Sequence, residues 1–316
     1  MAVNLLNIFK KNCQGQNLIF LISQPRAGST MTQKILGNHK RIHTVSEPWI
    51  LLPNLYPLRH DNFEAEYNSK LGKIGWSSFF KELPEEEETY YEGLRLMYSH
   101  IYGSALKGTG KKFFLDKTPR YYFIIPEIYR TFPQAKFIIL LRNPLAVICS
   151  IITTWVKNEW SGLEVLKYDL IRGPNLLLEG IDKLGDSCLV VYYEEIINNP
   201  VKEFNKICQS IGIKFYPEMI EYGVDNSIKW RFGDKGLVYE KSQPDPENLD
   251  KWILSLKNPQ IWQTASDYLE FLGEEIVSQM GYFYKELRET LDINRPQEFD
   301  FSQVSRVEWL QKNKHE

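Results

Sequence analysis

The feature that most constrains this chain is an apolar run, NLIFLIS at residues 17–23, that breaks at once into the polar loop QPRAGST. A run of this kind is typical of a parallel strand, because helices bury both faces of a parallel sheet. A helical pattern follows from Ser29 to about Gly37, so the loop connects a buried strand to the start of a helix. Backbone N–H groups and the helix dipole at such a junction bind anions. The feature therefore predicts an α/β fold with a phosphate-binding loop after its first strand.

The same alternation of strand and helix continues along the chain. Helices are indicated at 126–132 and 144–157, each with a proline in its first turn. Strands that alternate with helices predict a three-layer α/β sandwich around a central parallel sheet. With 316 residues, 43% of them hydrophobic, the chain can form one such domain with a cap of helices and loops beside it. The further strands are expected over four apolar runs, at 42–45, 112–116, 136–142 and 188–193.

Two stretches that carry several prolines and glycines interrupt this rhythm. We expect residues 48–90 to form a lid or insertion beside the site and residues 225–250 to form a flexible loop that closes over it. The reason is that long irregular segments of a compact domain are often lids or binding loops. From about residue 259 the pattern is helical until residue 291, and the polar tail at 292–316 is expected to dock loosely.

Charge and cysteine content exclude several classes of protein. Lys and Arg number 38 against 40 Asp and Glu, and the resulting net charge of −2 gives no sign of a nucleic-acid partner. The four cysteines show neither C-x-x-C spacing nor zinc spacing with histidine, which favours reduced thiols and no metal site. No apolar run approaches the roughly 18 residues of a membrane span, and the N-terminus lacks the charge order of a signal peptide. A cytoplasmic protein without a membrane partner is expected, while the oligomeric state cannot be inferred.

The loop after the first strand departs from the usual nucleoside-triphosphate loop, G-x-x-x-x-G-K-[ST]. Ser23 stands at its first glycine and Ser29 at its lysine. Gly28 permits a close approach of the backbone, and Arg26 and Thr30 supply donors to an anion. Without the lysine that reaches the outer phosphates, a kinase or GTPase is disfavoured. A P-loop small-molecule kinase and a non-catalytic nucleotide-binding protein remain as alternatives.

A second anion motif follows the strand expected at 136–142. Arg142 ends this strand, Pro144 opens a helix, and Ser150 lies eight positions after Arg142. An arginine at a strand end can bind a phosphate with two parallel hydrogen bonds, and a serine two helical turns on adds a hydroxyl from the same face.

Both motifs resemble those of the sulfotransferases that use 3′-phosphoadenosine 5′-phosphosulfate (PAPS), and the pattern is most similar to bacterial and tyrosylprotein members. Residues 25–30 match the family's P-[RK]-[SA]-G-[ST]-[ST] loop, and the resemblance extends over about residues 17–255. It implies that Arg142 and Ser150 hold the 3′-phosphate, that Arg26 lies close to the bridging oxygen, and that adenosine 3′,5′-bisphosphate (PAP) is the product. It also implies that five residues hold the 5′-phosphosulfate: Arg26, Ala27, Gly28, Ser29 and Thr30.

The resemblance also implies the catalytic groups. Glu47 lies 21 residues after Arg26, just past the strand at 42–45, and matches the family's general base, which removes the acceptor's proton. His43 is the alternative base, because the cytosolic branch of the family uses a histidine. Lys117, in the sequence DKTP, matches a lysine that donates to the bridging oxygen as its bond breaks. A transferred group with a single negative charge needs less charge stabilisation than a phosphoryl group, so no metal is expected.

The remaining parts of the nucleotide site and the acceptor pocket follow looser motifs. Tyr193, or its neighbour Tyr192, is expected beside the adenine, and Arg231 and Lys241 on a basic loop that closes over the 3′-phosphate. Arg120 is expected either to orient the lysine loop or to bind the acceptor. The acceptor itself is expected to be a hydroxyl or amine of a small natural product, bound by the cap. A carbohydrate or a peptide tyrosine is the alternative.

Overall fold

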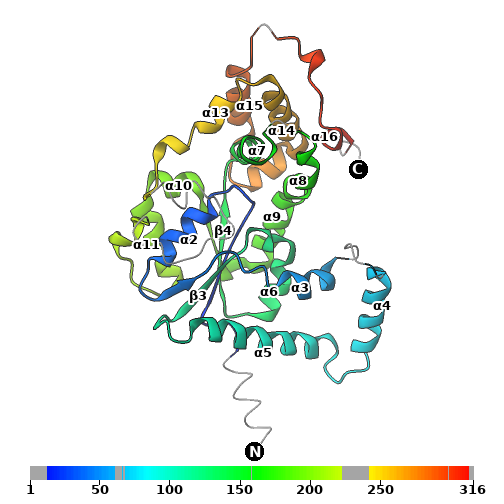
Figure 1. Ribbon diagram of the computed structural model, residues 1–316, viewed down its shortest axis with the longest axis vertical. Helices are drawn as coiled ribbons and strands as arrows, with labels where there is room; N and C mark the ends of the chain where they lie inside the picture. Colours follow the sequence, from blue (N-terminus) through cyan, green and yellow to red (C-terminus); the bar gives the residue numbers. More distant parts are fainter. Residues whose placement is uncertain are drawn as a thin grey trace, which may run out of the picture.

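A five-stranded parallel sheet forms the centre of the fold, with the strand order β2-β3-β1-β4-β5 (Figure 1). The protein is described by a computed structural model that covers residues 13–60, 66, 68–157, 159–222, 242–297 and 299–312. Every strand end lies within one residue of the end expected from the sequence, and the α/β fold is confirmed. The strands are β1 (Leu18–Ser23), β2 (Ile42–Thr44), β3 (Phe113–Lys117), β4 (Lys136–Leu141) and β5 (Cys188–Tyr192).

The strand register brings the polar segments that follow the strands to one edge of the sheet. Leu21 of β1 pairs with Lys117 at the end of β3, and Ser23 pairs with Leu140 of β4. Because all strands run in the same direction, the loops after them meet at the carboxyl edge. Open α/β sheets bind their ligands at this edge, so the register alone already indicates where a site belongs.

Helices cover both faces of the sheet, as a three-layer sandwich requires. Phe20 of β1 is fully buried on one face, and Ile19 and Leu21 are fully buried on the other. Burial of each such side chain contributes about 1.5–3 kcal/mol relative to exposure. The first face packs against α5 (Glu86–Leu106), α6 (Ile125–Thr131) and α9 (Gly173–Leu184), and the second against α2 (Ser29–Gly37), α10 (Tyr193–Asn198) and α11 (Pro200–Ile211) (Figure 1).

A third hydrophobic cluster lies beyond the carboxyl edge and is built from helices. α7 (Pro144–Ile151) begins directly after β4 and is capped by Asn143, whose Oδ1 accepts from the N–H of Leu145 at 2.9 Å. Its apolar sequence is buried at every position except Ser150 and continues into a π-helical turn over Ile152–Val156. The helices that surround it are α8 (Gly162–Ile171), α13 (Lys251–Ser255), α14 (Pro259–Gln279), α15 (Tyr284–Ile293) and α16 (Glu308–Lys312) (Figure 1).

The expectation of an irregular segment at 48–90 is wrong, because most of it is helical. α3 (Leu52–Arg59) and α4 (Ser69–Phe80) occupy it, and α5 begins at Glu86. Pro53 lies in the first turn of α3, where a backbone N–H is not needed. α4 lies at the side of the molecule, next to α5 (Figure 1), and none of its residues is buried. Its apolar residues Leu71, Ile74 and Phe79 are exposed by 54–64%, so they do not face the core.

The C-terminal tail is packed more firmly than expected. Leu310 of α16 is fully buried, and Phe301 packs against Trp262 of α14 with ring centroids 5.0 Å apart. Arg306 forms an ion pair with Asp267, which is 1% exposed. A buried carboxylate needs such a partner, and the tail supplies it.

Part of the loop expected at 225–250 falls outside the description, since residues 223–241 are not among the described residues. Residues 242–250 follow, and they include a short 3-10 turn at Pro246–Asn248. No helix within the described ranges combines the length and the apolar character that a membrane crossing requires.

Candidate functional site

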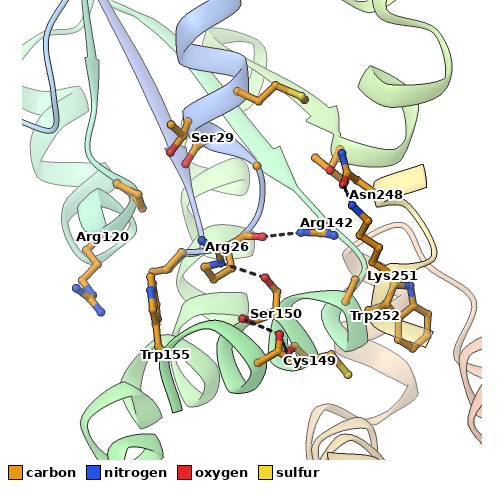
Figure 2. A pocket seen from close by; sticks show the side chains of 18 of the residues that line it. Arg26, Ser29, Arg120, Arg142, Cys149, Ser150, Trp155, Asn248, Lys251 and Trp252 are labelled. Carbon is orange, nitrogen blue, oxygen red and sulfur yellow. Dashed lines mark hydrogen bonds between the residues drawn. The ribbon is translucent and has the colours of Figure 1, made fainter. Parts of the chain in front are cut away.

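A cavity of about 660 Å³ opens at the carboxyl edge of the sheet, and its walls include the loop after β1, the start of α2 and α7 (Figure 2). Arg26 and Arg142, which are 116 residues apart in the sequence, face the same space. The parallel sheet explains this convergence, because it carries the ends of β1 and β4 to one edge. Eight of the predicted site residues line the cavity together: Arg26, Gly28, Ser29, Thr30, Glu47, Arg142, Ser150 and Tyr193.

The loop after β1 adopts a conformation that favours glycine at one position. Arg26 and Gly28 both have positive φ angles, of 68° and 95°, and Gly28 is the N-cap of α2. A Cβ atom at Gly28 would lie 2.3 Å from the ring of Tyr193, so only glycine fits between the loop and this ring. The first turn of α2 holds no acidic residue, and its N–H groups lie outside the helix's own hydrogen-bond ladder. This local structure suits an anion at the start of α2.

Arg142 and Ser150 lie against this loop, as Figure 2 shows. Nη1 of Arg142 donates to the carbonyl oxygen of Arg26 at 2.8 Å, and Nε of Arg26 donates to Oγ of Ser150 at 3.0 Å. The guanidinium of Arg142 stacks on Tyr193, with Cζ 4.2 Å from the ring centroid. Nε of Arg142 is buried and has no hydrogen-bond partner among the residues that the structure describes. A buried donor of this kind is costly unless a ligand satisfies it, so the arrangement suits an anion beside Arg142.

The two expected catalytic side chains, Glu47 and Lys117, bind each other directly. Nζ of Lys117 lies 2.5 Å from Oε1 of Glu47 and 3.5 Å from Oγ1 of Thr30. Burial lowers the pKa of the Lys117 ammonium, and the charge of Glu47 opposes that shift. Glu47 also accepts a hydrogen bond from Nε1 of Trp49 at 3.1 Å. Glu47 therefore lines the cavity, whereas the fully buried Lys117 lies behind Glu47 and Thr30.

A buried carboxylate, Asp116, organises the loop that carries Glu47. It accepts hydrogen bonds from the hydroxyls of Tyr102 at 2.7 Å, Thr118 at 3.0 Å and Tyr121 at 3.2 Å. Burial raises the pKa of Asp116 to about 6. Thr118 in turn accepts the backbone N–H of Trp49 at 3.3 Å, and Trp49 has a positive φ of 60°. This network ties the end of β3 to the loop of the candidate base, although the sequence analysis assigns Asp116 no role.

Arg120 is fixed by a second buried carboxylate. Its Nε lies 2.9 Å from Oδ1 of Asp169 and its Nη2 lies 2.5 Å from Oδ2, which makes a bidentate pair. Tyr122 donates to the same carboxylate. The guanidinium of Arg120 lies 5.6 Å from the centre of the Trp49 ring. Arg120 lines the cavity beside this ring.

Lys251 and its neighbours Asn248 and Trp252 also line the cavity, although the sequence analysis assigns them no role. Nζ of Lys251 donates to Oδ1 of Asn248 at 2.7 Å. Figure 2 shows Lys251 on the side of Arg142 and across the cavity from Arg120. A signal for this residue was available in the sequence, since LDKW at residues 249–252 directly follows the basic loop that is expected to close over the 3′-phosphate. Lys251 adds a further cation to the side of the cavity where Arg142 lies.

Four other predicted residues do not form part of the described cavity wall. His43 lies within β2, where its ring packs edge-on against Phe114 with centroids 5.8 Å apart, and burial lowers the pKa of its imidazole. This position makes it a poorer candidate base than the carboxylate at the cavity. Ala27 is almost completely buried, and Arg231 and Lys241 lie outside the described residues. Across the described ranges, no group of three or more His, Cys, Asp or Glu side chains is placed to hold a metal ion.

Comparisons with known proteins agree with this geometry. Residues 18–218 match the profile of the sulfotransferase family. The chain is similar to the nodulation protein NoeE of Sinorhizobium fredii, with 24% identity over 291 residues that cover 84% of this chain and 66% of that protein. It is also similar to protein-tyrosine sulfotransferase 2 of Gallus gallus, with 24% identity over 252 residues that cover 75% of this chain and 63% of that protein. The chain thus spans just under two thirds of the length of these two relatives.

Two solved structures share the fold. The sulfotransferase domain from the curacin biosynthetic pathway has a TM-score of 0.53 at 20% identity, with 84% of this chain and 97% of that chain covered. The sulfotransferase domain from the Synechococcus PCC 7002 olefin synthase has a TM-score of 0.50 at 24% identity, with 74% and 86% covered. The family profile covers more than half of this chain, and the matched residues include both anion motifs and the DKTP sequence. The chain therefore belongs to the sulfotransferase family.

Proposed function

We propose that this chain is an enzyme that moves the sulfuryl group of PAPS to a hydroxyl or amine of a small-molecule acceptor. The observation that carries the proposal is the meeting of two anion motifs in one cavity. Arg26 of the first motif is hydrogen-bonded to both Arg142 and Ser150 of the second. A nucleotide with anionic groups at both its 3′ and 5′ positions matches such a double site, and membership of the family supports the same reaction.

The residues of the cavity fit this nucleotide. The first turn of α2, with Ser29 and Thr30, would hold the 5′-phosphosulfate. Arg142 and Lys251 would hold the 3′-phosphate, which would give the buried Nε of Arg142 its partner. The ring of Tyr193 would form the wall beside the nucleoside.

The chemistry assigned to the protein side chains is proton removal and charge stabilisation. When bound, PAPS supplies a sulfuryl group whose bond to the 5′-phosphate oxygen breaks as a bond to the acceptor oxygen forms. Glu47 takes the proton that the acceptor hydroxyl loses. Arg26 and Lys117 stabilise the negative charge left on the phosphate oxygen, and Lys117 reaches the anion loop at Thr30. With a hydroxyl acceptor the products are PAP and a sulfate ester, with an amine they are PAP and a sulfamate, and in both cases the proton resides on Glu47.

The ion pair between Glu47 and Lys117 couples these two tasks. While the pair is closed, the charge of each side chain is compensated by the other across 2.5 Å. Nζ of Lys117 contacts both Glu47 and Thr30 of the loop after β1. A nucleotide anion bound at this loop would therefore compete with Glu47 for the lysine. Nucleotide binding would in this way free the carboxylate for the acceptor, so we infer that the nucleotide binds before the base acts.

Alternatives to this proposal concern the kind of acceptor and the class of enzyme. A peptide tyrosine is the main alternative to a small molecule, because protein-tyrosine sulfotransferases are among the relatives, and a carbohydrate is the other. A P-loop kinase lacks support, since Ser29 stands where the lysine of such enzymes would be. The cytoplasmic location stays a prediction.

The test is the preference for a 3′-phosphate. PAP and adenosine 5′-phosphate are titrated calorimetrically into the wild type and into the variants Arg142→Ala and Lys251→Ala. We expect Arg142→Ala to lower the preference for PAP about tenfold to a hundredfold, because a hydrogen-bonded charge contributes about 1.5–3 kcal/mol. Lys251→Ala should lower this preference less, because a lysine ammonium on a flexible stem lacks the planar fork by which an arginine binds a phosphate with two hydrogen bonds.

Arg142 also supports the carbonyl of Arg26, so the ratio of the two affinities is the readout rather than either affinity alone. Arg130→Ala is the matched control, since this arginine pairs with Glu87 at the surface. Equal losses of affinity for both nucleotides in Arg142→Ala would place the 3′ site elsewhere. Turnover is then sought with PAPS and a panel of acceptors, by the mass gain of one sulfo group.

A further inference from the structure

A second cavity, the α3 groove, adjoins the nucleotide cavity. It has a volume of about 510 Å³. Trp49 and Arg120 line both cavities, so the two are continuous at this pair. The groove is lined by seven residues: Trp49, Leu52, Pro53, Tyr56, Pro57, Arg120 and Phe123.

The pair at the junction places the candidate base at the inner end of the groove. Nε1 of Trp49 donates to Oε2 of Glu47, so one edge of the indole holds the carboxylate while the ring lines the groove. Arg120 lies over the same ring and is clamped by its bidentate contact with Asp169. Both sides of the junction are thus held by hydrogen bonds before any ligand arrives, which is typical of a preformed site.

The helix that forms the floor of the α3 groove is also held in place, by packing against the core. Leu51 and Leu55 are fully buried and anchor α3 to the core. Leu52 and Tyr56, four positions apart, lie on the groove side of the helix. The rings of Tyr56 and Phe123 meet edge to face, with centroids 5.7 Å apart at an angle of 75°. This corner presents apolar surface in two directions to a ligand.

The chemistry of the lining selects the kind of ligand. Six of the seven side chains are aromatic, proline or leucine, and the seventh, Arg120, is already paired with Asp169. Such walls attract a flat apolar ring through burial and ring contacts. The hydroxyl groups of a sugar or the amides of a peptide would lose their water there without enough partners, which costs binding energy.

We propose that the α3 groove binds the body of the acceptor, and that the acceptor is a hydroxyl compound on a flat, apolar ring system. The hydroxyl points past Trp49 to Glu47, and the ring lies against Tyr56 and Phe123. This inference rests on the proposed function for its reaction, but binding in the groove does not depend on turnover. Leu52 and Tyr56 then act as determinants of acceptor specificity.

The test measures binding of naphthol, with N-acetylglucosamine as the hydrophilic counterpart, by calorimetry with and without saturating PAP. We expect Leu52→Asp and Tyr56→Ala each to weaken naphthol binding about tenfold, because each removes apolar contact area or adds a charge to the groove. Their affinity for PAP should stay within about twofold of the wild type, since neither residue lines the nucleotide cavity. The matched controls are Val201→Asp and Phe283→Ala, at residues exposed by 54% and 71%.

Failure of the two proposals can be told apart. Wild-type protein that binds naphthol but not PAP would refute the proposed function and leave the groove assignment standing. Wild-type protein that binds PAP but fails to bind naphthol would overturn the inference. So would naphthol affinity that is the same in Leu52→Asp, Tyr56→Ala and the controls, or tighter binding of N-acetylglucosamine than of naphthol.

Discussion

Replacement of Glu47 by glutamine is expected to destabilise the protein through Lys117. The amide keeps the size of the side chain and can still accept from the indole N–H of Trp49, but it carries no charge. Lys117 is fully buried, and in the wild type its ammonium lies 2.5 Å from the Glu47 carboxylate. In the variant this buried ammonium has no charged partner there. Removal of one partner from a buried ion pair costs about 3–5 kcal/mol. Against a typical unfolding free energy of about 5–15 kcal/mol, the loss should be large and easy to measure.

The pH dependence of this loss follows from the pKa of Lys117. Burial lowers that pKa below its usual 10.5, and the charge of Glu47 partly restores it. In Glu47→Gln the restoring charge is gone, so the pKa in the folded protein falls further. Between that lower value and 10.5 the unfolded chain binds a proton that the folded chain does not, and stability therefore rises with pH. The deficit of the variant against the wild type should be largest near neutrality and should shrink toward about pH 9–10.

Urea unfolding followed by tryptophan fluorescence, at neutral and alkaline pH, measures both effects. The double variant Glu47→Gln/Lys117→Met removes the stranded charge and should recover more than half of the loss, with a coupling energy of about 2 kcal/mol or more. Glu164→Gln is the matched control, because its ion pair with Lys167 is exposed and should matter little. A deficit below about 1 kcal/mol that does not change with pH would show that Lys117 is not confined with Glu47 as the structure has it.

Three further predictions test other parts of the site. Gly28→Ala forces a Cβ to within 2.3 Å of the Tyr193 ring and should weaken PAP binding about tenfold or more in calorimetry, whereas Gly212→Ala, also at positive φ but in open space, should leave PAP affinity unchanged. Equal PAP affinities in the two variants would contradict the fit. Because Asp116 has a pKa raised from 3.8 to about 6, the folded protein binds its proton more tightly than the unfolded chain, so stability is gained as the pH falls from 7 to 4. Relative to Asp116→Asn, the wild type should gain about 2.5 kcal/mol over this range in urea unfolding, and a difference that does not change with pH would refute the shift. His43→Gln should keep turnover of the acceptor found by the mass-gain screen within about twofold, and a hundredfold loss would return the role of base to His43.

The sheet could be predicted from sequence because its central strands are apolar runs buried on both faces, as β1 and β3 are throughout. A run such as residues 17–23, followed at once by a polar loop, is typical of a strand in the middle of an α/β sandwich, and the fold confirms it. The helices α3 and α4 could not be predicted in the same way. The prolines of residues 48–90 indicate irregular structure, but Pro53 among them lies in a first helical turn that tolerates it. The apolar residues of α4 include Leu71, Ile74 and Phe79, but they are exposed rather than packed in the core, and glycines interrupt the helix sequence.

The candidate site also has features that could be predicted from the sequence and features that could not. The two anion motifs meet because parallel strands end at one edge, which spacing and strand order are enough to foresee. The relation between Glu47 and Lys117 depends instead on how far two side chains reach, and local sequence does not encode that distance. The same holds for Arg120 and Asp169, which are 49 residues apart in the chain and meet only in the folded protein.

At Trp49, backbone stability and the function of the side chain favour different residues. Its φ of 60° costs about 1–2 kcal/mol for a residue with a side chain, and glycine would relieve that strain. Glycine would at the same time remove the indole that donates to Glu47 and that lines both cavities. Engineering for heat tolerance should therefore favour glycine at position 49, whereas engineering for catalysis should favour tryptophan. A library screened for thermal robustness alone should discard this tryptophan early, and a library screened for product should retain it.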